Sequence, residues 1–521
     1  MLDMEGLAGA LEGLPGVAHL ERRPYWCSSV GRQALQAAVR GDALQCVVVA
    51  GCSPRTHRRL FQQALGQAGL NPDLLGMVNI REGCAWPHHA ERRAATLRAR
   101  DQVAMEVAHL AALAPRPPAQ AGISPQALVI GAGVSGMTAA LALADAGISI
   151  TLVERSAQPG GAALAAAPDL VADLSAAVQH QPRIRLLLGS RISRVDGPVG
   201  AYRVEVTTHP SPVTQPGPFG AIIVATGSPD SHTTELARWL RLPQDTQGYL
   251  PEWRVRLRPG SFIQRGIYVC GAAHAPCDVT QAQFQAYSAA SRALCHLRQG
   301  SITAHGPAAQ VDADKCNGCG DCFTVCPFAA VSMVARPAGL SLSAIDPLLC
   351  TGCGNCVSVC PVGAVEVAGW TDAQLEVQMQ VALGGPSRLL VFACEWSGYA
   401  AAELAGARRL AYPPHVRLIR LGCSGRLQPG LILKAFELGA AGVLVLGCPP
   451  KLCHYEQGNQ RAAAAHGQVE ALTHLLGLPS VRLGLAWVPP DDGAAFAELV
   501  TAFAQGLEAW QVPAVEAHGH R

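Results

Sequence analysis

A cysteine pattern that occurs twice constrains this chain more than any other feature. Residues 316–327 and residues 350–361 both have the spacing C-x2-C-x2-C-x3-C-P. In each copy the first three thiolates can hold one face of an iron–sulfur cube, while the fourth cysteine ligates the other cube. Zinc, the alternative, prefers ligands in two separated pairs. The pattern therefore predicts a ferredoxin-like domain with two [4Fe–4S] clusters.

The predicted ligand sets cross between the two copies. For the first cluster we expect Cys316, Cys319, Cys322 and Cys360. For the second cluster we expect Cys350, Cys353, Cys356 and Cys326. Cluster ligation needs reduced thiolates, so the 19 cysteines of the chain indicate a reducing compartment rather than a disulfide framework.

Composition excludes several other classes of protein. The 521 residues are 49% hydrophobic and 15% charged, which predicts several domains with substantial cores. A formal charge of +2 without a basic tail argues against a nucleic-acid partner. The first residues lack the pattern of a signal peptide, and no stretch has the pattern of a membrane span. We expect a cytoplasmic protein whose attachment to any membrane complex is through partners.

A glycine-rich turn predicts a dinucleotide-binding domain. A short apolar strand at 127–130 runs directly into a G-x-G-x-x-G turn formed by Gly131, Gly133 and Gly136. A helix follows, and the next strand ends at Glu154. The glycines let the backbone approach a pyrophosphate, the helix N-terminus supplies donors, and the acid is placed to bind a ribose hydroxyl.

Two later turns favour FAD over NAD. The strand before Thr226 and Gly227 ends in an Ala-Thr-Gly turn typical of flavoproteins with two dinucleotide folds. The segment that ends at Gly271, followed by Asp278 and a helix, resembles their last flavin motif, in which the aspartate holds the ribityl–pyrophosphate side of FAD. A second G-x-G-x-x-G is missing between Gly136 and Thr226, so we expect no nicotinamide domain. The predicted FAD-binding residues are Gly131, Gly133, Gly136, Glu154, Thr226, Gly227, Gly271 and Asp278.

The last part of the chain has the alternating pattern of a doubly wound sheet. The predicted strands are residues 389–393, 416–421 and 442–446. They end near Cys394, Cys423 and Cys448, and Cys453 lies on the loop after the third strand. Because parallel strands place their carboxyl ends on one edge, these cysteines are expected to converge. Four thiolates suit a [2Fe–2S] cluster or zinc, and buried structural cysteines are the alternative.

The first 113 residues give the weakest signal. Apolar strands end near Cys52 and Cys84, and Cys27 precedes the first expected helix. Two interpretations stay open here, a further cluster on Cys27, Cys52 and Cys84, and a docking domain with unused thiols.

These patterns predict an α/β multidomain protein. A Pro-rich linker at 114–118 and a Gly-Gly-Pro sequence at 384–386 mark two of the boundaries. The expected units are an N-terminal α/β domain, a Rossmann-like FAD-binding domain, a 2[4Fe–4S] ferredoxin domain and a C-terminal doubly wound iron–sulfur domain. Their expected ranges are 1–113, 122–300, 307–368 and 386–521.

Longer motifs resemble the heterodisulfide reductase A-subunit family over roughly residues 20–368. They are Cys52-Ser53-Pro54-Arg55-Thr56-His57, Gly69-Leu70-Asn71-Pro72, Asn79-Ile80-Arg81-Glu82 and Gly271-Ala272-Ala273-His274-Ala275-Pro276, beside the flavin turn and the cysteine repeat. The tail is similar to the delta subunit of methyl-viologen-reducing hydrogenase through Cys394-Glu395-Trp396, Tyr412-Pro413-Pro414, Cys423-Ser424-Gly425-Arg426 and Cys453-His454-Tyr455. It departs from that subunit at Ser397, where a second cysteine is typical. Such a fusion also resembles the B subunit of the quinone-interacting membrane-bound oxidoreductase.

The resemblance implies a flavin and iron–sulfur oxidoreductase subunit that passes electrons between FAD, [4Fe–4S] and [2Fe–2S] centres and partner subunits. The implied partners are heterodisulfide-reductase-like, hydrogenase, formate dehydrogenase or quinone-interacting subunits. No catalytic side chain is predicted, because the chemistry resides in the cofactors. The alternative function is a non-catalytic wiring and docking subunit of a quinone-interacting complex of sulfur metabolism.

Overall fold

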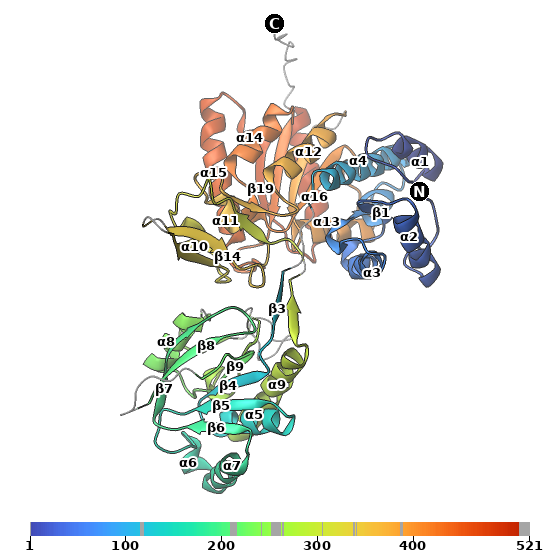
Figure 1. The fold of residues 1–521 in the computed structure, drawn as a ribbon. Helices are drawn as coiled ribbons and strands as arrows, with labels where there is room; N and C mark the ends of the chain where they lie inside the picture. The colour runs from blue at the N-terminus through green and yellow to red at the C-terminus, as the bar shows by residue number, and fades with distance from the viewer. Residues whose placement is uncertain are drawn as a thin grey trace.

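The fold has two lobes joined by a narrow connection, as Figure 1 shows. The computed structural model describes residues 2–114, 119–208, 216–240, 242–251, 262, 265–304, 306–336, 339, 341–385 and 389–509. The greater part of the expected Pro-rich linker, at 115–118, and Pro386 lie outside these ranges. The connection is an antiparallel pair of short strands, β3 (Gln120–Gly122) and β11 (Ser301–Thr303).

The lower lobe in Figure 1 is a parallel sheet with the strand order β10-β9-β4-β5-β6. Its strands are β4 (Gln126–Ile130), β5 (Ser149–Val153), β6 (Ile184–Leu187), β9 (Ala221–Val224) and β10 (Ile267–Val269). Successive residues of each strand alternate between two separate hydrophobic cores, one on each face. Burial on both faces explains why most residues of these strands are apolar, as in other parallel sheets.

Helices cover one face of this sheet, and a mixed layer covers the other. The first layer contains α5 (Val134–Asp145), α7 (Pro168–His180) and α9 (Val279–Arg298). The second contains the hairpin β7 (Ser190–Asp196) and β8 (Arg203–Thr208) and the helix α8 (Ser231–Leu240). The helices α5 and α9 lie side by side. Both begin at the carboxyl edge of the sheet, because each follows a strand that ends there.

The ferredoxin segment repeats one unit twice, as the cysteine pattern does. Its helices are α10 (Asp321–Val325) and α11 (Asn355–Ser358). Its strands are β12 (Ala309–Val311), β13 (Val331–Ala335), β14 (Ser341–Ile345) and β15 (Val365–Val367), paired β12–β15 and β13–β14. Small apolar side chains from both copies form one shared core with several of the cysteines.

The C-terminal unit is a four-stranded parallel sheet of order β17-β16-β18-β19. The strands are β16 (Leu389–Cys394), β17 (Val416–Leu421), β18 (Gly442–Gly447) and β19 (Leu483–Trp487). One face packs against α12 (Asp372–Leu383), α14 (Pro429–Glu437) and α15 (Gly458–Leu475), and the other packs against α13 (Gly398–Ala407) and α16 (Gly493–Ala509). The doubly wound interpretation is confirmed, although no sequence pattern indicated β19.

The N-terminal segment packs against the C-terminal unit rather than against the flavin-type lobe (Figure 1). It contains α1 (Met4–Glu12), α2 (Ser29–Gly41), α3 (Pro54–Gln67) and α4 (Arg92–Ala111) around the parallel pair β1 (Val47–Gly51) and β2 (Leu75–Asn79). The helix α4 lies along α12 and reaches β17. The backbones also approach closely, because a Cβ on Gly406 would lie 1.7 Å from the Glu82 carbonyl oxygen.

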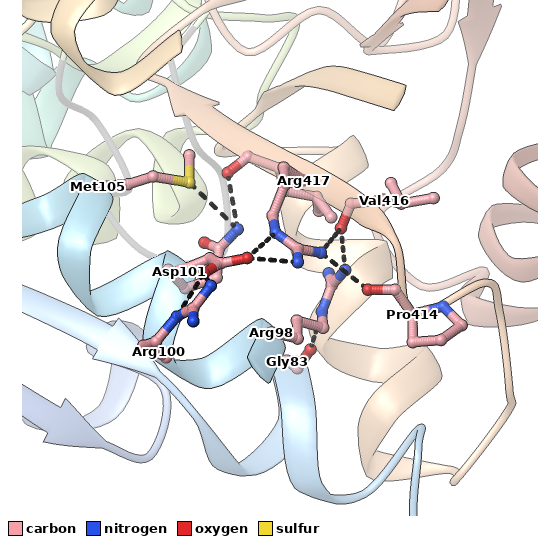
Figure 2. Close-up of polar contacts among 10 residues, drawn as sticks. Gly83, Arg98, Arg100, Asp101, Met105, Pro414, Val416 and Arg417 are labelled. Carbon is pink, nitrogen blue, oxygen red and sulfur yellow. Dashed lines mark hydrogen bonds and ion pairs between the residues drawn. The ribbon is translucent and has the colours of Figure 1, made fainter. Parts of the chain in front are cut away.

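A buried network of charged side chains joins these two segments, as Figure 2 shows. Arg417 of β17 donates to the Asp101 carboxylate of α4, with an Nη2–Oδ2 distance of 2.6 Å. Arg98, one turn before Asp101, donates to the backbone carbonyls of Gly83 and Val416. Both ions of the pair lie almost wholly inside the protein, so each depends on its partner.

None of the helices among the described residues is long and apolar enough to cross a membrane.

Candidate flavin and iron–sulfur sites

The glycine turn between β4 and α5 leaves an open space at the carboxyl edge of the sheet. Gly131 has a φ of +103°, and a Cβ there would lie 2.3 Å from the Ala225 carbonyl oxygen. A Cβ on Gly136 would lie 1.8 Å from the Gly131 carbonyl oxygen. A Cβ on Gly133 would meet no atom of the described chain within 4 Å. The first and third glycines therefore serve the packing, while the second faces the space that a pyrophosphate would need.

Glu154 fixes the conformation of this turn. Its carboxylate is buried at the end of β5 and accepts hydrogen bonds from the backbone N–H of Ala132, at 2.7 Å, and of Ser156, at 2.8 Å. A small cavity beside it is lined by Gly131, Glu154 and Thr226, among others. Two of the predicted FAD-binding residues from distant parts of the sequence thus meet Gly131 at one edge of the sheet.

Gly160 and Gly161 belong to the same edge, although the sequence motifs did not single them out. Gly160 forms a β-bridge with Gly133, and its N–H donates to the Ala132 carbonyl oxygen at 2.8 Å. Both glycines have positive φ, +121° and +59°. The signal that could have revealed them is the Gly-Gly pair that follows the acid at the end of β5.

The remaining predicted flavin residues lie where β9 and β10 end. Gly271 approaches α5 so closely that a Cβ there would lie 2.1 Å from the Ser135 Oγ. Gly227 also has a positive φ, +81°. Asp278 caps α9 by accepting a hydrogen bond from the Gln281 N–H at 2.7 Å. The start of α9 thus lies at the same edge of the sheet as the start of α5, and the edge offers two helix N-termini to an anionic dinucleotide.

The second predicted ferredoxin set is assembled in the structure. The thiols of Cys326, Cys350 and Cys356 lie near that of Cys353. Burial, reinforced by the neighbouring thiols, raises the pKa of Cys353 to about 12. The backbone N–H of Ala309 donates to the Cys350 Sγ at 3.2 Å. Such N–H···S contacts surround the cysteine ligands of iron–sulfur clusters and tune their potentials.

The first predicted set is nearer the surface. Cys319 is exposed, while Cys322 is buried and donates to the Ser343 Oγ at 3.0 Å. Burial opposes ionisation of Cys316, but hydrogen bonds from Ser343 and other backbone groups outweigh it and leave the pKa of this thiol below its usual value. Cys360 packs into the same core as Cys322 and accepts a hydrogen bond from the Ala364 N–H at 3.1 Å.

Four cysteines converge at the carboxyl edge of the C-terminal sheet. The Sγ atoms of Cys394 and Cys448 are 3.7 Å apart, and each thiol of the four hydrogen-bonds to two others. These shared hydrogen bonds lower the pKa of Cys394 and Cys453 and raise those of Cys423 and Cys448. The four thiols therefore share one hydrogen-bond network, and thiolate is the form of cysteine that binds iron or zinc.

Ser397, which stands where the delta subunit typically has a further cysteine, does not join this site. Its Oγ donates to the Val488 carbonyl oxygen at 2.8 Å. Aromatic side chains to which the sequence motifs gave no role cover the site instead. The Trp396 Nε1 donates to the Tyr455 hydroxyl at 3.1 Å, and the Trp396 ring stacks on His454. The positions of Trp396 and Tyr455 next to two of the cysteines were the available signal.

The second ferredoxin set lies between the flavin-type lobe and the C-terminal cysteines. Leu348 and Leu349, directly before Cys350, pack against the core that contains α5 and α9. On its other side, Cys353 shares a hydrophobic cluster with Cys423. Figure 1 shows the ferredoxin segment in this middle position. Residues that are far apart in sequence thus place the second ferredoxin set beside the C-terminal cysteines and join its segment to the core of the flavin-type lobe.

The N-terminal cysteines are not brought together in this way. Cys27 packs in the core around Phe61, whereas Cys84 is fully buried in a different core that contains Leu7. The Cys52 Sγ lies 3.2 Å from the His57 Nδ1. A common cluster on Cys27, Cys52 and Cys84 stays a prediction without a geometric basis.

The type of ligand atom, rather than an arrangement suited to a single metal ion, supports the cysteine sets as cluster sites. Among the residues that the structure describes, no group of three or more His, Cys, Asp or Glu side chains is arranged to hold a single metal ion. Each of the three later sets nevertheless offers four soft thiolate donors, with backbone N–H groups directed at sulfur. Such donors suit iron–sulfur clusters better than any hard cation.

The fold and these sites together define an FAD-dependent iron–sulfur oxidoreductase. Three family profiles match in chain order. They are an NAD(P)-binding Rossmann-like domain at 129–188, a 4Fe-4S dicluster domain at 315–364, and the delta subunit of methyl-viologen-reducing hydrogenase at 389–510.

Curated relatives are A subunits of heterodisulfide reductases. The A subunit of the ferredoxin:CoB-CoM heterodisulfide reductase of Methanosarcina mazei is 23% identical, with 97% of this chain and 94% of that protein covered. An iron–sulfur A subunit of the CoB–CoM enzyme from Methanopyrus kandleri is 32% identical over 43% of this chain and 35% of its own length. The chain is thus similar to heterodisulfide reductase A subunits along nearly its whole length, and residues 389–510 are similar to a hydrogenase delta subunit.

Solved structures match a smaller part of the chain. The thioredoxin reductase of T. acidophilum covers 33% of it with a TM-score of 0.26 and 11% identity. The thioredoxin reductase of Lactococcus lactis covers 34% with a TM-score of 0.23 and 12% identity. These likenesses are too weak to bear on function.

Proposed function

We propose that this chain carries electrons between FAD and partner subunits through two [4Fe–4S] clusters and one [2Fe–2S] cluster in a heterodisulfide-reductase-like complex. When bound, the flavin supplies two-electron chemistry and the clusters supply one-electron chemistry. The partners are other redox subunits, of heterodisulfide reductase, hydrogenase, formate dehydrogenase or quinone-interacting type. The complex is cytoplasmic, or is attached to a membrane through those partners.

One observation carries this proposal: the segment of the second ferredoxin set packs against the flavin-type lobe on one side and against the C-terminal cysteine set on the other. Leu349 packs against the flavin-type core, and Cys353 packs against Cys423 of the C-terminal set. An electron relay needs its redox sites to follow one another through the protein, whereas a docking protein without redox function does not.

Each group has its own set of residues in this proposal. FAD is held by the glycine turn at Gly131, Gly133 and Gly136, by Glu154, and by the edge that includes Thr226, Gly227, Gly271 and Asp278. The [4Fe–4S] clusters take the two ferredoxin sets, and the [2Fe–2S] cluster takes Cys394, Cys423, Cys448 and Cys453. The Sγ atoms of Cys394 and Cys448 in this last set are 3.7 Å apart, which supports a common ligand there.

The test is the cofactor content of anaerobically purified protein, combined with electron paramagnetic resonance (EPR) during stepwise reduction. We expect one FAD and about ten iron atoms, from two cubanes and one [2Fe–2S] cluster. Cys453→Ser should remove the [2Fe–2S] signal and about two irons and leave both [4Fe–4S] signals. Zinc in place of iron at the C-terminal site, or protein without FAD, would refute the relay. About fourteen irons would instead indicate a further cluster in the N-terminal segment.

A further inference from the structure

Asn355 stands out among the buried side chains of the described chain, because neither end of its amide has a partner. The residue is 1% exposed, and both Nδ2 and Oδ1 lack a hydrogen bond. Burying an amide without partners is unfavourable, and native proteins rarely do so without a functional reason. An unmet donor at such a position indicates a group that is bound in the working protein.

The amide of Asn355 projects into the C-terminal cysteine site, although the residue belongs to the ferredoxin segment. One reference point, the position that a Cβ on Gly458 would occupy, lies 2.1 Å from the Cys423 Sγ, 3.4 Å from the Cys453 Sγ and 3.7 Å from the Asn355 Oδ1. A Cβ on Gly425 would lie 2.2 Å from the same Oδ1. The two glycines thus make room for the amide beside the thiols.

The backbone of Asn355 faces the other way. Its N–H hydrogen-bonds toward the Cys353 thiol, within the second ferredoxin set. The main chain of this one residue is therefore directed at one predicted cluster, and its side chain at the next. The side-chain amide is the part of Asn355 that lies beside the thiols of Cys423 and Cys453.

The equivalent residue of the first cysteine copy has a different environment. Asp321 occupies the same position in its motif, between the second and third cysteines, but it is exposed. The motif alone therefore does not require a buried amide. The amide of Asn355 is buried because α11 packs against the C-terminal unit.

We propose that Asn355 is a positioning residue that donates a hydrogen bond to the iron–sulfur group held by Cys394, Cys423, Cys448 and Cys453, and so raises its reduction potential. The assignment rests on the function proposed above. Reduction adds negative charge to a cluster, and an N–H donor directed at its sulfur atoms stabilises the reduced form more than the oxidised form. The two ends of an amide interchange by a flip, so the donor can turn toward sulfur without backbone movement.

The experiment is a redox titration of the full-length holoprotein, followed by EPR, with Asn355→Leu and Asn355→Ala. Leucine keeps the side-chain size without a donor, and alanine serves as the second variant where leucine does not pack. We expect the equilibrium constant for one-electron reduction of the [2Fe–2S] cluster to fall threefold to tenfold. That change corresponds to a reduction potential lower by about 30 to 59 mV. The [4Fe–4S] potentials should move less.

The matched control is Asp321→Ala, the equivalent change in the first cysteine copy, which should leave the [2Fe–2S] potential unchanged. An unchanged [2Fe–2S] potential in both Asn355 variants, or a shift confined to the [4Fe–4S] centres, would overturn the role of Asn355 and leave the relay intact. A wild-type protein without a [2Fe–2S] signal would overturn both. Resonance Raman spectra give a second readout, because loss of an N–H···S bond shifts the Fe–S stretching bands.

Discussion

Removal of the Asp101 carboxylate should release α4 from the C-terminal unit. In Asp101→Ala, the guanidinium of Arg417 would lose a bidentate contact, with Nε–Oδ2 and Nη2–Oδ2 distances of 3.1 and 2.6 Å. The Arg417 side chain is only 4% exposed and Arg98 lies beside it, so Arg417 would remain buried without its anion, next to a second cation. Figure 2 shows that the other acceptors of Arg417 are backbone carbonyl oxygens.

Breaking a buried ion pair on one side costs about 3–5 kcal/mol. We take the lower end, about 3 kcal/mol, because Arg417 keeps hydrogen bonds to the Pro414 and Val416 carbonyl oxygens. That free energy corresponds to about a hundredfold change in the equilibrium between closed and open α4. Hydrogen–deuterium exchange of the α4 amides, read by mass spectrometry, measures this local opening without assuming two-state unfolding of the whole chain.

Arg100→Ala is the matched control. Arg100 also contacts the Asp101 carboxylate, with an Nε–Oδ1 distance of 2.8 Å, but its side chain is 37% exposed. Exposed pairs contribute about 0–1 kcal/mol, so exchange in α4 should accelerate by about fivefold at most. Equal acceleration in both variants, or unchanged exchange in Asp101→Ala, would show that burial of the pair does not hold α4 in place.

Two further predictions concern the flavin site and the interface. Gly136→Ala should lose both FAD absorbance and thermal stability, because its Cβ would collide with the Gly131 carbonyl oxygen, whereas Gly133→Ala should lose FAD while keeping the stability of the apoprotein. Equal flavin content in Gly133→Ala and wild type would contradict the position given to the pyrophosphate. Burial raises the pKa of Glu403, which accepts a hydrogen bond from Asn79 across the interface. A carboxyl group whose pKa is raised by folding binds its proton more tightly in the folded state than in the unfolded state. Its contribution to stability is therefore present at low pH and is lost as pH rises through the folded-state pKa. At pH 8, Glu403→Gln should therefore unfold at a higher temperature than wild type. The difference in unfolding temperature should vanish as the pH falls toward the ordinary carboxyl pKa of 4.5. A difference that does not depend on pH would disprove the argument.

The elements that local patterns encode were predictable from the sequence. The strand, glycine turn, helix and acid around Gly131 and Glu154 occur where expected, within one to three residues at their ends. The strands that end at Cys394 and Cys448 were also predictable, because a run of apolar residues bounded by turn residues marks a buried parallel strand. Convergence of their cysteines then follows from the geometry of a parallel sheet.

Features that depend on tertiary packing were not predictable. The strand β19 contains Gly484, which weakens a strand pattern, yet a Cβ there would lie 2.8 Å from the Leu444 side chain. The Asp101–Arg417 pair joins residues 316 positions apart, and no local pattern relates them. For the same reason the sequence could not show that the N-terminal segment packs on the C-terminal unit.

The two cysteine copies show most clearly where a motif stops determining environment. Cys319 is exposed and its equivalent Cys353 is 8% exposed, while Phe323 is 40% exposed and its equivalent Val357 is 1% exposed. Residues outside the motif cause this difference. Arg426 of the C-terminal unit packs so closely on Gly354 that a Cβ there would lie 2.9 Å from its side chain, and Gly425 and Gly458 admit the Asn355 amide. The repeat specifies two equivalent cluster sites, and the surface of the neighbouring unit makes one of them internal.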